Sequence, residues 1–384
     1  MNSLKRIMAI FKKEILHVMR DRVAFSMCFL ASLALTMLMG FVYEKGKVTD
    51  IPIVVYDGDK TDLSRQLLNA FNDSERLKVI KYVDSYEAVK KAIDTGKADA
   101  GIVIQQGLKK NVKSSKSQEV LVILNGNNTL VMSTVGNAAL QIVQTYSAAI
   151  NIKVMEGSGI AKDKAYETAT ALTYKSRVWY NSTGDYGAFM LLGLVGTIVQ
   201  QVSFLAVALS ITRDKENKIM KNLAMTKLKS YEIFTGKFLF YFLVFLANSL
   251  IVHSIAINFF EIPQRGNLFL MAFLIAIFVA AIMMIGLFIS VLLKSQVQAI
   301  QLSMLLAVPS YVLSGYTWPV YSMPNFVQKI SYALPLTHFL RAIKAIMYME
   351  QGFSTIKYDL YYLVGIIVLF LPLNIFILEK NMEK

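Results

Sequence analysis

The chain is poor in the residues that most often build metal and redox sites. Its 384 residues include one cysteine and three histidines. The lone Cys28 excludes an intrachain disulfide and a cysteine-based metal site. His17, His253 and His338 are far apart in the sequence and lack the spacings of zinc ligands. The sequence therefore predicts no metal centre.

The motifs of nucleotide binding and covalent catalysis are also missing. No glycine-rich loop ends in Lys-Ser or Lys-Thr, the pattern that cradles the phosphates of a nucleotide. We therefore expect no ATP site and no cofactor on this chain. No set of acid, base, nucleophile or metal ligand converges near the end of an apolar run, which disfavours an integral membrane enzyme.

Charged residues are scarce as well. They make up 17% of the chain, whereas soluble domains carry about a quarter. A bilayer core about 30 Å thick needs about 20 apolar helical residues to cross it. We therefore predict an α-helical membrane protein with six transmembrane helices. The six apolar runs are Val23–Tyr43, Tyr186–Ile211, Phe238–Phe260, Leu268–Leu293, Ala299–Val312 and Leu360–Leu378.

The excess of positive charge indicates which loops face the cytoplasm. The basic residues behind the net charge of +14 concentrate in the N-terminal segment and after the second run. Cytoplasmic flanks have this Lys and Arg content, and the distribution argues against nucleic-acid binding. With six spans, we expect a multi-pass protein of the plasma (cytoplasmic or inner) membrane with both termini in the cytoplasm.

A mostly polar stretch, residues 44–184, separates the first two runs. Its strand-like segments alternate with helical spacing, which predicts a small mixed sheet covered by helices. The orientation makes this stretch an extracytoplasmic α/β domain inserted between the first and second spans. Two helical patterns, Thr129–Met155 and Lys162–Tyr174, end it. The expected strands are Ile51–Tyr56, Leu77–Val83, Asp99–Ile104 and Glu119–Leu124.

The N-terminal residues 1–22 are predicted to form a cytoplasmic amphipathic helix that lies in the membrane interface. Packing of this helix on the protein itself is the alternative. The first transmembrane helix follows at 23–43, and residues 185–384 hold the other five. The apolar stripe of the N-terminal helix comprises Leu4, Met8, Phe11, Ile15 and Val18.

Two segments carry a resemblance to a known family. Residues 213–227 read Arg-Asp-Lys-Glu-Asn-Lys-Ile-Met-Lys-Asn-Leu-Ala-Met-Thr-Lys. They resemble the cytoplasmic loop of type-two ABC exporter permeases, in which a charged start precedes a short helix. The charged start, Leu223 and Thr226 match that loop. The departures are Lys218, Ile219, Lys221 and Lys227, where the family usually has Gly, Thr, Glu and Pro.

The second segment follows the fifth apolar run and is similar to a signature of the same family. The inserted stretch is also similar to the extracytoplasmic domain of the multidrug-exporter-like branch, through Val-Tyr-Asp-Gly-Asp at 55–59. The resemblance covers almost the whole chain. The landmarks of the second segment are Pro309, Ser314-Gly315, Trp318-Pro319, Met323-Pro324, Pro335-Leu336-Thr337 and Arg341.

The resemblance implies the membrane-spanning permease subunit of an ATP-driven ABC exporter. It implies that two permease chains, alike or paralogous, pair and bind two separate ATP-binding subunits. ATP hydrolysis would then belong to those subunits, and this chain would be no enzyme. A periplasmic adaptor is an open further partner. An apolar path with few fixed charges favours a lipophilic or amphiphilic cargo, drug-like or lipid-like, that leaves the cytoplasm or the inner leaflet.

The family loop also implies a coupling helix at 213–226. A short basic helix between two spans can dock on a soluble partner and pass its movement to both spans. Leu223 and Met225 could offer apolar contact to a groove in that partner. Asp214 and Glu216 are expected early in this helix, where negative charge favours the helix dipole. A solvated charged loop beside anionic lipid is the structural alternative. The implied coupling residues are Arg213, Glu216, Leu223 and Thr226.

Two further groups of residues are candidates for the transport route. Amides within the spans either line a translocation path or form hydrogen bonds between helices. These amides are Gln200, Gln201, Asn248 and Gln298. The proline-rich segment 315–350 is too broken to be a span, and we predict a re-entrant segment at the outer face. Its candidate outer-gate residues, Gly315, Trp318, Pro319 and Pro335, could equally belong to a packed cap.

A receptor is the alternative function. A membrane-anchored receptor or secretion-apparatus component could bind a protein through its external domain and move no solute. Co-purification with an ATP-binding subunit would distinguish the two functions.

Overall fold

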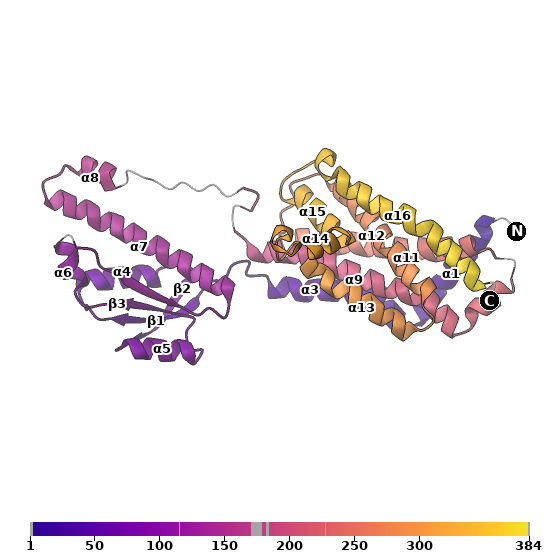
Figure 1. Ribbon diagram of the computed structural model, residues 1–384, viewed down its shortest axis with the longest axis horizontal. Helices are drawn as coiled ribbons and strands as arrows, with labels where there is room; N and C mark the ends of the chain where they lie inside the picture. Colours follow the sequence, from indigo (N-terminus) through magenta and orange to yellow (C-terminus); the bar gives the residue numbers. More distant parts are fainter. Residues whose placement is uncertain (1–2, 115, 170–178, 182–183, 227, 383–384) are drawn as a thin grey trace. The chain divides into compact units, whose positions relative to one another are not determined.

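The computed structural model describes residues 3–114, 116–169, 179–181, 184–226 and 228–382. The chain divides into two compact units (Figure 1). One comprises Met1–Gly46 and Val178–Lys384, and holds the apolar runs. The other, Lys47–Arg177, lies within the predicted inserted stretch. Each unit has its own hydrophobic core, so each is described separately below.

The first unit is a helical bundle. Within the described residues, six helices are long and apolar enough to cross a bilayer, which confirms the predicted number. The first span is continuous over Arg22–Val42 and consists of α2 (Arg22–Phe25), a π-helical turn (Ser26–Leu30) and α3 (Ala31–Val42). The other five are α9 (Tyr186–Glu216), α11 (Ser230–Asn258), α12 (Leu268–Leu292), α13 (Gln296–Leu313) and α16 (Phe353–Met382).

Helix α9 is the most buried of the six spans, and α12 packs against both α9 and α16. Small residues allow close approach along α9. A Cβ added at Gly193 would lie 2.5 Å from the ring of Tyr316, and one at Gly196 would lie 2.9 Å from Phe339. Such small residues are typical of helix interfaces in membranes. Movement of α9 must therefore move its neighbours.

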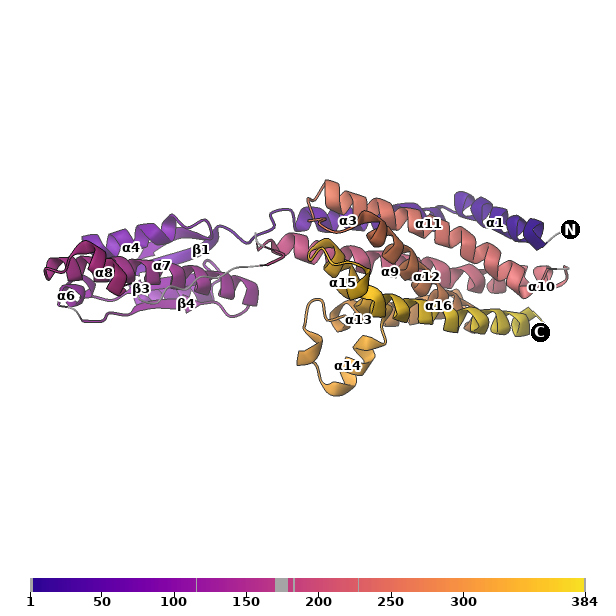
Figure 2. The same cartoon turned by 90° about the horizontal axis from the view of Figure 1, so that it is seen from above.

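Helix α1 (Ser3–Arg20) precedes the first span and packs along α11 (Figure 2). The predicted amphipathic helix is present, but only part of its apolar stripe is covered by the protein. Phe11 and Val18 pack against the bundle, whereas Leu4 and Met8 are exposed. The helix therefore has one face on the protein and an apolar face left for the membrane interface. Its position in that interface stays a prediction.

Residues 315–350, which were predicted to lie at the outer face and are called the outer segment, fold into helices. A short 3₁₀ turn, Val320–Ser322, is followed by α14 (Asn325–Tyr332) and α15 (Pro335–Met347). Both helices contact α13, and α15 also packs against α12 and α16 (Figure 2). Most of α15 is buried, so this segment is largely a packed cap over the bundle.

The second unit confirms the predicted α/β domain. Its four-stranded sheet has the order β2-β1-β3-β4, in which β1 is parallel to β2 and β3, and β4 is antiparallel to β3. Helices α4 and α7 pack on one face and α5 on the other (Figure 1). The strands are β1 (Ile51–Asp57), β2 (Leu77–Val83), β3 (Ala100–Ile104) and β4 (Val120–Leu124).

The helices of this unit begin at recognisable caps. The side chain of Thr61 caps α4 in a capping box with Ser64, and the side chain of Ser85 caps α5. The predicted helix Lys162–Tyr174 is present as far as Ala169, and its last five residues lie outside the described residues. The five helices are α4 (Asp62–Asn72), α5 (Tyr86–Asp94), α6 (Leu108–Lys113), α7 (Thr129–Gly157) and α8 (Lys162–Ala169).

Candidate coupling site

Four consecutive residues at the C-terminal end of α9 bind four different helices. Arg213 donates to Glu14 of α1 at 3.3 Å. Asp214 accepts from Lys13 of α1 at 2.6 Å and forms an ion pair with Lys237 of α11 at 2.7 Å. Lys215 and Glu216 bind the turn between α12 and α13. We call residues 213–216 the α9 hub, because α1, α11, α12 and α13 all meet there.

The centre of the α9 hub is a buried charge cluster. Glu14, Asp214 and Lys237 are each at most 1% exposed. The Lys237 ammonium lies 2.7 Å from Glu14, 2.7 Å from Asp214 and 3.0 Å from the Ser210 carbonyl oxygen. An ammonium has three donors, so all three are satisfied. Tyr241 completes the cluster by donating its hydroxyl to Glu14 at 3.2 Å.

The electrostatics of the cluster keep Glu14 ionised. Burial alone would raise the pKa of this carboxyl, but the positive charges of Lys237 and Lys13 outweigh burial and lower it. Buried charges are tolerated only when they are paired and hydrogen-bonded, because their desolvation is costly. The cluster therefore holds α1, α9 and α11 in one arrangement.

The other half of the α9 hub caps two helix ends. The Lys215 ammonium donates to the carbonyl oxygens of Ser290 and Leu293, at 3.1 and 2.9 Å, and also to that of Val291. These carbonyls end α12 and lack partners within the helix. Glu216 accepts the backbone N–H of Gln296 at 2.8 Å, at the start of α13. Both charges complement the helix dipoles they face.

The short helix α10 (Ile219–Ala224) follows the α9 hub directly. Lys218 begins it in the left-handed region with φ 58°, which turns the chain away from α9. Met220 is buried and Leu223 is half-buried against the bundle. Met225 is 83% exposed just after the helix. An exposed apolar side chain on a short basic segment is suited to contact with a soluble partner.

The structure corrects the predicted helix at 213–226. Arg213, Asp214 and Glu216 lie in the last turn of α9 and not at the start of α10. Helix α9 continues through them because each finds a partner on a neighbouring helix. Of the remaining coupling residues, Leu223 packs inward, and Thr226 is exposed and donates its hydroxyl to the Leu223 carbonyl oxygen at 2.6 Å. Met225 takes the exposed position instead.

Three residues of the cluster were not predicted from the sequence to be functional. Glu14 is the only acidic residue among the 18 of α1, a signal that could have marked it as a buried partner. Lys237 was interpreted only as one of the positive charges on the cytoplasmic side. Tyr241 gave no signal, because an aromatic residue in an apolar run is ordinary.

The predicted path amides do not come together. Gln201 lines a cavity of about 260 Å³ with residues of the first span and α13. Gln200 is buried, and its Oε1 has no hydrogen-bond partner among the described residues. The Asn248 amide donates to the carbonyl oxygens of Cys28 and Phe29, both at 3.4 Å. It therefore forms hydrogen bonds with the π-helical turn of the first span. Gln298 is exposed.

The predicted gate residues are spread over the outer segment. Gly315 has φ +81°, and a Cβ there would lie 2.4 Å from Val320. Pro319 precedes the 3₁₀ turn, and Pro335 begins α15 at a position where proline is favoured. The Trp318 side chain is 58% exposed. These four residues shape the segment, but they do not form one constriction.

A second charged cluster, which we call the outer cluster, ties α15 to α16. His338 places Nδ1 2.8 Å from Asp359 and Nε2 2.9 Å from the Tyr332 carbonyl oxygen. Arg341 donates from Nε to both oxygens of Asp359, at 3.0 and 3.1 Å. Its guanidinium is half-exposed. Arg341 is one of the family landmarks in the sequence, but its ion pair with Asp359 was not predicted.

Comparison with known proteins agrees with this architecture. Residues 22–376 match the family described as ABC-2 family transporter protein. The chain is 26% identical over 361 residues to the probable multidrug ABC transporter permease YbhR of Escherichia coli strain K12, covering 94% of this chain and 95% of that protein. It is 24% identical to the inner membrane transport permease YhhJ of the same strain, covering 93% and 92%.

Proposed function

Because the chain belongs to the ABC-2 family of transporter proteins, we propose that it is the membrane-spanning permease subunit of an ATP-driven exporter. Its cargo is a lipophilic or amphiphilic molecule, drug-like or lipid-like, that leaves the cytoplasm or the inner leaflet. The apolar bundle, whose buried amides are few, supports cargo of this class. ATP is bound and hydrolysed by separate subunits.

The α9 hub is the observation that carries this proposal. A partner that pushes α10 displaces the end of α9, since only Asn217 and the left-handed Lys218 separate the two helices. Lys215 and Glu216 pass this displacement to α12 and α13. Asp214 passes it to α1 and α11 through Lys13 and Lys237. One docking event can therefore reorient most of the bundle.

The contacts of the hub support the proposed topology. The ends of α9 and α12 and the starts of α11 and α13 meet at one end of the bundle. Asn381 near the C-terminus joins them by donating to the Val291 carbonyl oxygen at 2.7 Å. Both termini then lie on the same side, as an even number of spans requires. The positive charge there supports a cytoplasmic position for this side of the bundle and, with it, the proposed extracytoplasmic position of the α/β unit.

The partner face of the bundle is proposed to include α13. This helix leaves an apolar row exposed beside the 260 Å³ cavity that Gln201 and Ser303 line. A second permease chain, identical or paralogous, would close this face and complete a path between the two copies. The exposed row comprises Val297, Met304, Leu305, Val308 and Val312.

Substitution at Met225 tests the coupling role in the complex with its ATP-binding subunit. The complex is isolated in mild detergent and reconstituted, and ATPase activity and efflux of a fluorescent amphiphile are measured. Met225→Asp should abolish efflux and reduce complex formation, because a charge replaces the exposed apolar contact. Met225→Leu is the matched control and should retain both. Normal efflux with Met225→Asp would refute the docking role.

Purification separates this function from that of a receptor. An exporter subunit should retain an ATP-binding chain through gel filtration. If no ATP-binding chain co-purifies and the α/β unit retains a protein partner, the receptor function is favoured.

A further inference from the structure

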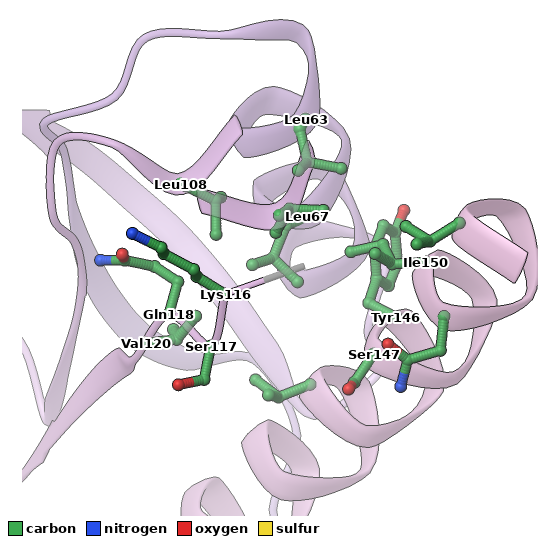
Figure 3. A pocket seen from close by; sticks show the side chains of 14 residues that line it. Leu63, Leu67, Leu108, Lys116, Ser117, Gln118, Val120, Tyr146, Ser147 and Ile150 are labelled. Carbon is green, nitrogen blue, oxygen red and sulfur yellow. The ribbon is translucent and has the colours of Figure 1, made fainter. Parts of the chain in front are cut away.

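The α/β unit contains an open groove that the transport proposal leaves unused. Its volume is about 430 Å³, within the range of small-molecule sites. Figure 3 shows Leu67 and Leu108 on one side and Tyr146 and Ile150 of α7 on the other. The loop before β4 closes one end with Lys116 and Gln118.

The groove exists because α7 is longer than the sheet that it covers. Its 29 residues extend about 43 Å, whereas the longest strands extend about 23 Å. The buried residues of α7 are Val135, Ala138 and Ala139, all in its first half. The second half passes beyond the strands. Tyr146 still reaches α4, because its hydroxyl donates to the Gln66 carbonyl oxygen at 2.8 Å, and beyond it Ile150 and Val154 line the groove.

The walls of the groove are largely apolar, although α7 also contributes the polar side chains of Ser147 and Asn151. Helix α4 contributes two leucines, and Leu108 and Val112 come from α6. Ile150 and Val154 face them from α7 and are only half-buried, so they have apolar surface left to cover. Covering it with an alkyl chain gains about 0.8 kcal/mol for each buried CH₂.

The charge at the groove is positive and localised. Lys116 is the only charged residue among the lining residues that the structure describes. Its ammonium has no ion-pair partner in the described part of the chain. Neighbouring groups are already engaged, since Lys109 pairs with Asp62 at 3.3 Å and Gln118 accepts from Asn111 at 2.6 Å. An anionic group at this end would therefore find a free cation.

We propose that this groove binds a single-chain anionic amphiphile. The alkyl chain lies between α4, α6 and the second half of α7, and the acid group pairs with Lys116. Binding requires neither ATP nor a partner subunit, so its test is independent of the transport proposal.

A thiol-protection experiment tests the site in the full chain. Cys28→Ser removes the native thiol, and Ser147→Cys places one in the groove wall. Ser133→Cys, on the exposed surface of α7 outside the groove, is the matched control. The proteins are held in nanodiscs of zwitterionic lipid without any ATP-binding subunit, and the rate of maleimide labelling is measured. The probes are dodecanoate and dodecyltrimethylammonium, which share a chain length but differ in charge.

Dodecanoate should slow labelling at position 147 by about tenfold at ten times its dissociation constant, without effect at position 133. Dodecyltrimethylammonium should protect far less. Lys116→Glu should weaken dodecanoate protection by about fivefold and reverse the order of the two probes. Absent protection, equal protection by both probes, equal protection at both positions or an unchanged order with Lys116→Glu would each overturn the proposal.

Discussion

The α9 hub and the outer cluster show two uses of buried charge within one bundle. The hub joins residues more than 190 positions apart, such as Glu14 and Arg213, and its core is fully buried. The outer cluster joins His338 and Arg341 to Asp359, at most 21 positions away. Its arginine is half-exposed. The hub ties α9 to four other helices, whereas the outer cluster ties α15 to α16 and to the end of α14.

This difference indicates what each cluster does. Buried ion pairs contribute little net stability, because desolvation offsets their attraction, but removing one partner is strongly destabilising. A buried cluster that joins α1, α9 and α11 therefore specifies the arrangement of these three helices. A cluster at the start of α16 can hold the outer cap in place without constraining the rest of the bundle.

Removal of Glu14 should have the largest effect. Glu14→Ala leaves the buried ammonium of Lys237 with one carboxylate fewer, and should cost about 3–5 kcal/mol of stability. Thermal unfolding in detergent measures the loss. Lys12→Ala, on the exposed side of the same helix, is the control and should change little. Equal unfolding temperatures for the two variants would show that the cluster does not hold the bundle together.

A double substitution separates stability from coupling. Glu14→Leu combined with Lys237→Met replaces charge by apolar volume and should recover most of the stability lost in Glu14→Ala. We expect efflux to stay impaired, because the tie that fixes α1 against the α9 hub is gone. Full efflux in this variant would contradict a role of the cluster in coupling.

Disruption of the outer cluster should have a smaller effect. Asp359→Asn keeps the size of the side chain but removes the charge that His338 and Arg341 share. Arg341 remains partly hydrated, so the expected loss is about 1–3 kcal/mol. Thermal unfolding measures this loss on the same scale as that of Glu14→Ala. A loss as large as the one for Glu14→Ala would abolish the distinction between the two clusters.

Lys215→Met should have a modest effect on stability and a clear one on coupling. The helix end at α12 loses its cationic cap, at a cost of about 1 kcal/mol. ATPase activity of the complex should persist while efflux per ATP falls. Lys12→Met, on the exposed side of α1, is the matched control. Unchanged efflux per ATP in Lys215→Met would show that the α12 cap is not part of the coupling route.

The smallest effect is expected with pH. Because the pKa of Glu14 is below its ordinary value of 4.5, the stability contributed by its charge is complete above that value and is lost as the pH falls through the lower, folded pKa. The difference in unfolding temperature between the unmodified chain and Glu14→Gln should thus stay constant above about pH 5 and shrink below about pH 4. A difference that shrank near neutral pH would contradict the stated charge state.

Much of the fold could be predicted from the sequence because bilayer and sheet impose strong periodic patterns. The six spans and the four strands occur near the predicted ranges. The end of α9 could not be located, since Arg213 and Glu216 look like a solvated loop until their partners are known. Ion pairs between Lys13 and Asp214, 201 positions apart, leave no local pattern.

The candidate site was therefore found only in part. The sequence pointed to the segment that contains the α9 hub, through Arg213 and Glu216, but assigned these residues to a docking helix and not to the end of the span before it. It offered both Leu223 and Met225 as apolar contacts to a partner, of which Met225 is exposed and Leu223 packs inward. Helical spacing cannot decide which of two neighbouring apolar residues points outward when the helix is only six residues long.

Photo-crosslinking from position 225 tests the central claim most directly. A photoreactive amino acid replaces Met225 or, as the control, Phe259, which is exposed just after the other end of α11. The chain is expressed with its ATP-binding subunit and irradiated in membranes. We predict a crosslink to the ATP-binding subunit from position 225 and none from position 259. A crosslink from position 259 alone would place the ATP-binding subunit at the opposite end of the bundle and contradict the proposed coupling.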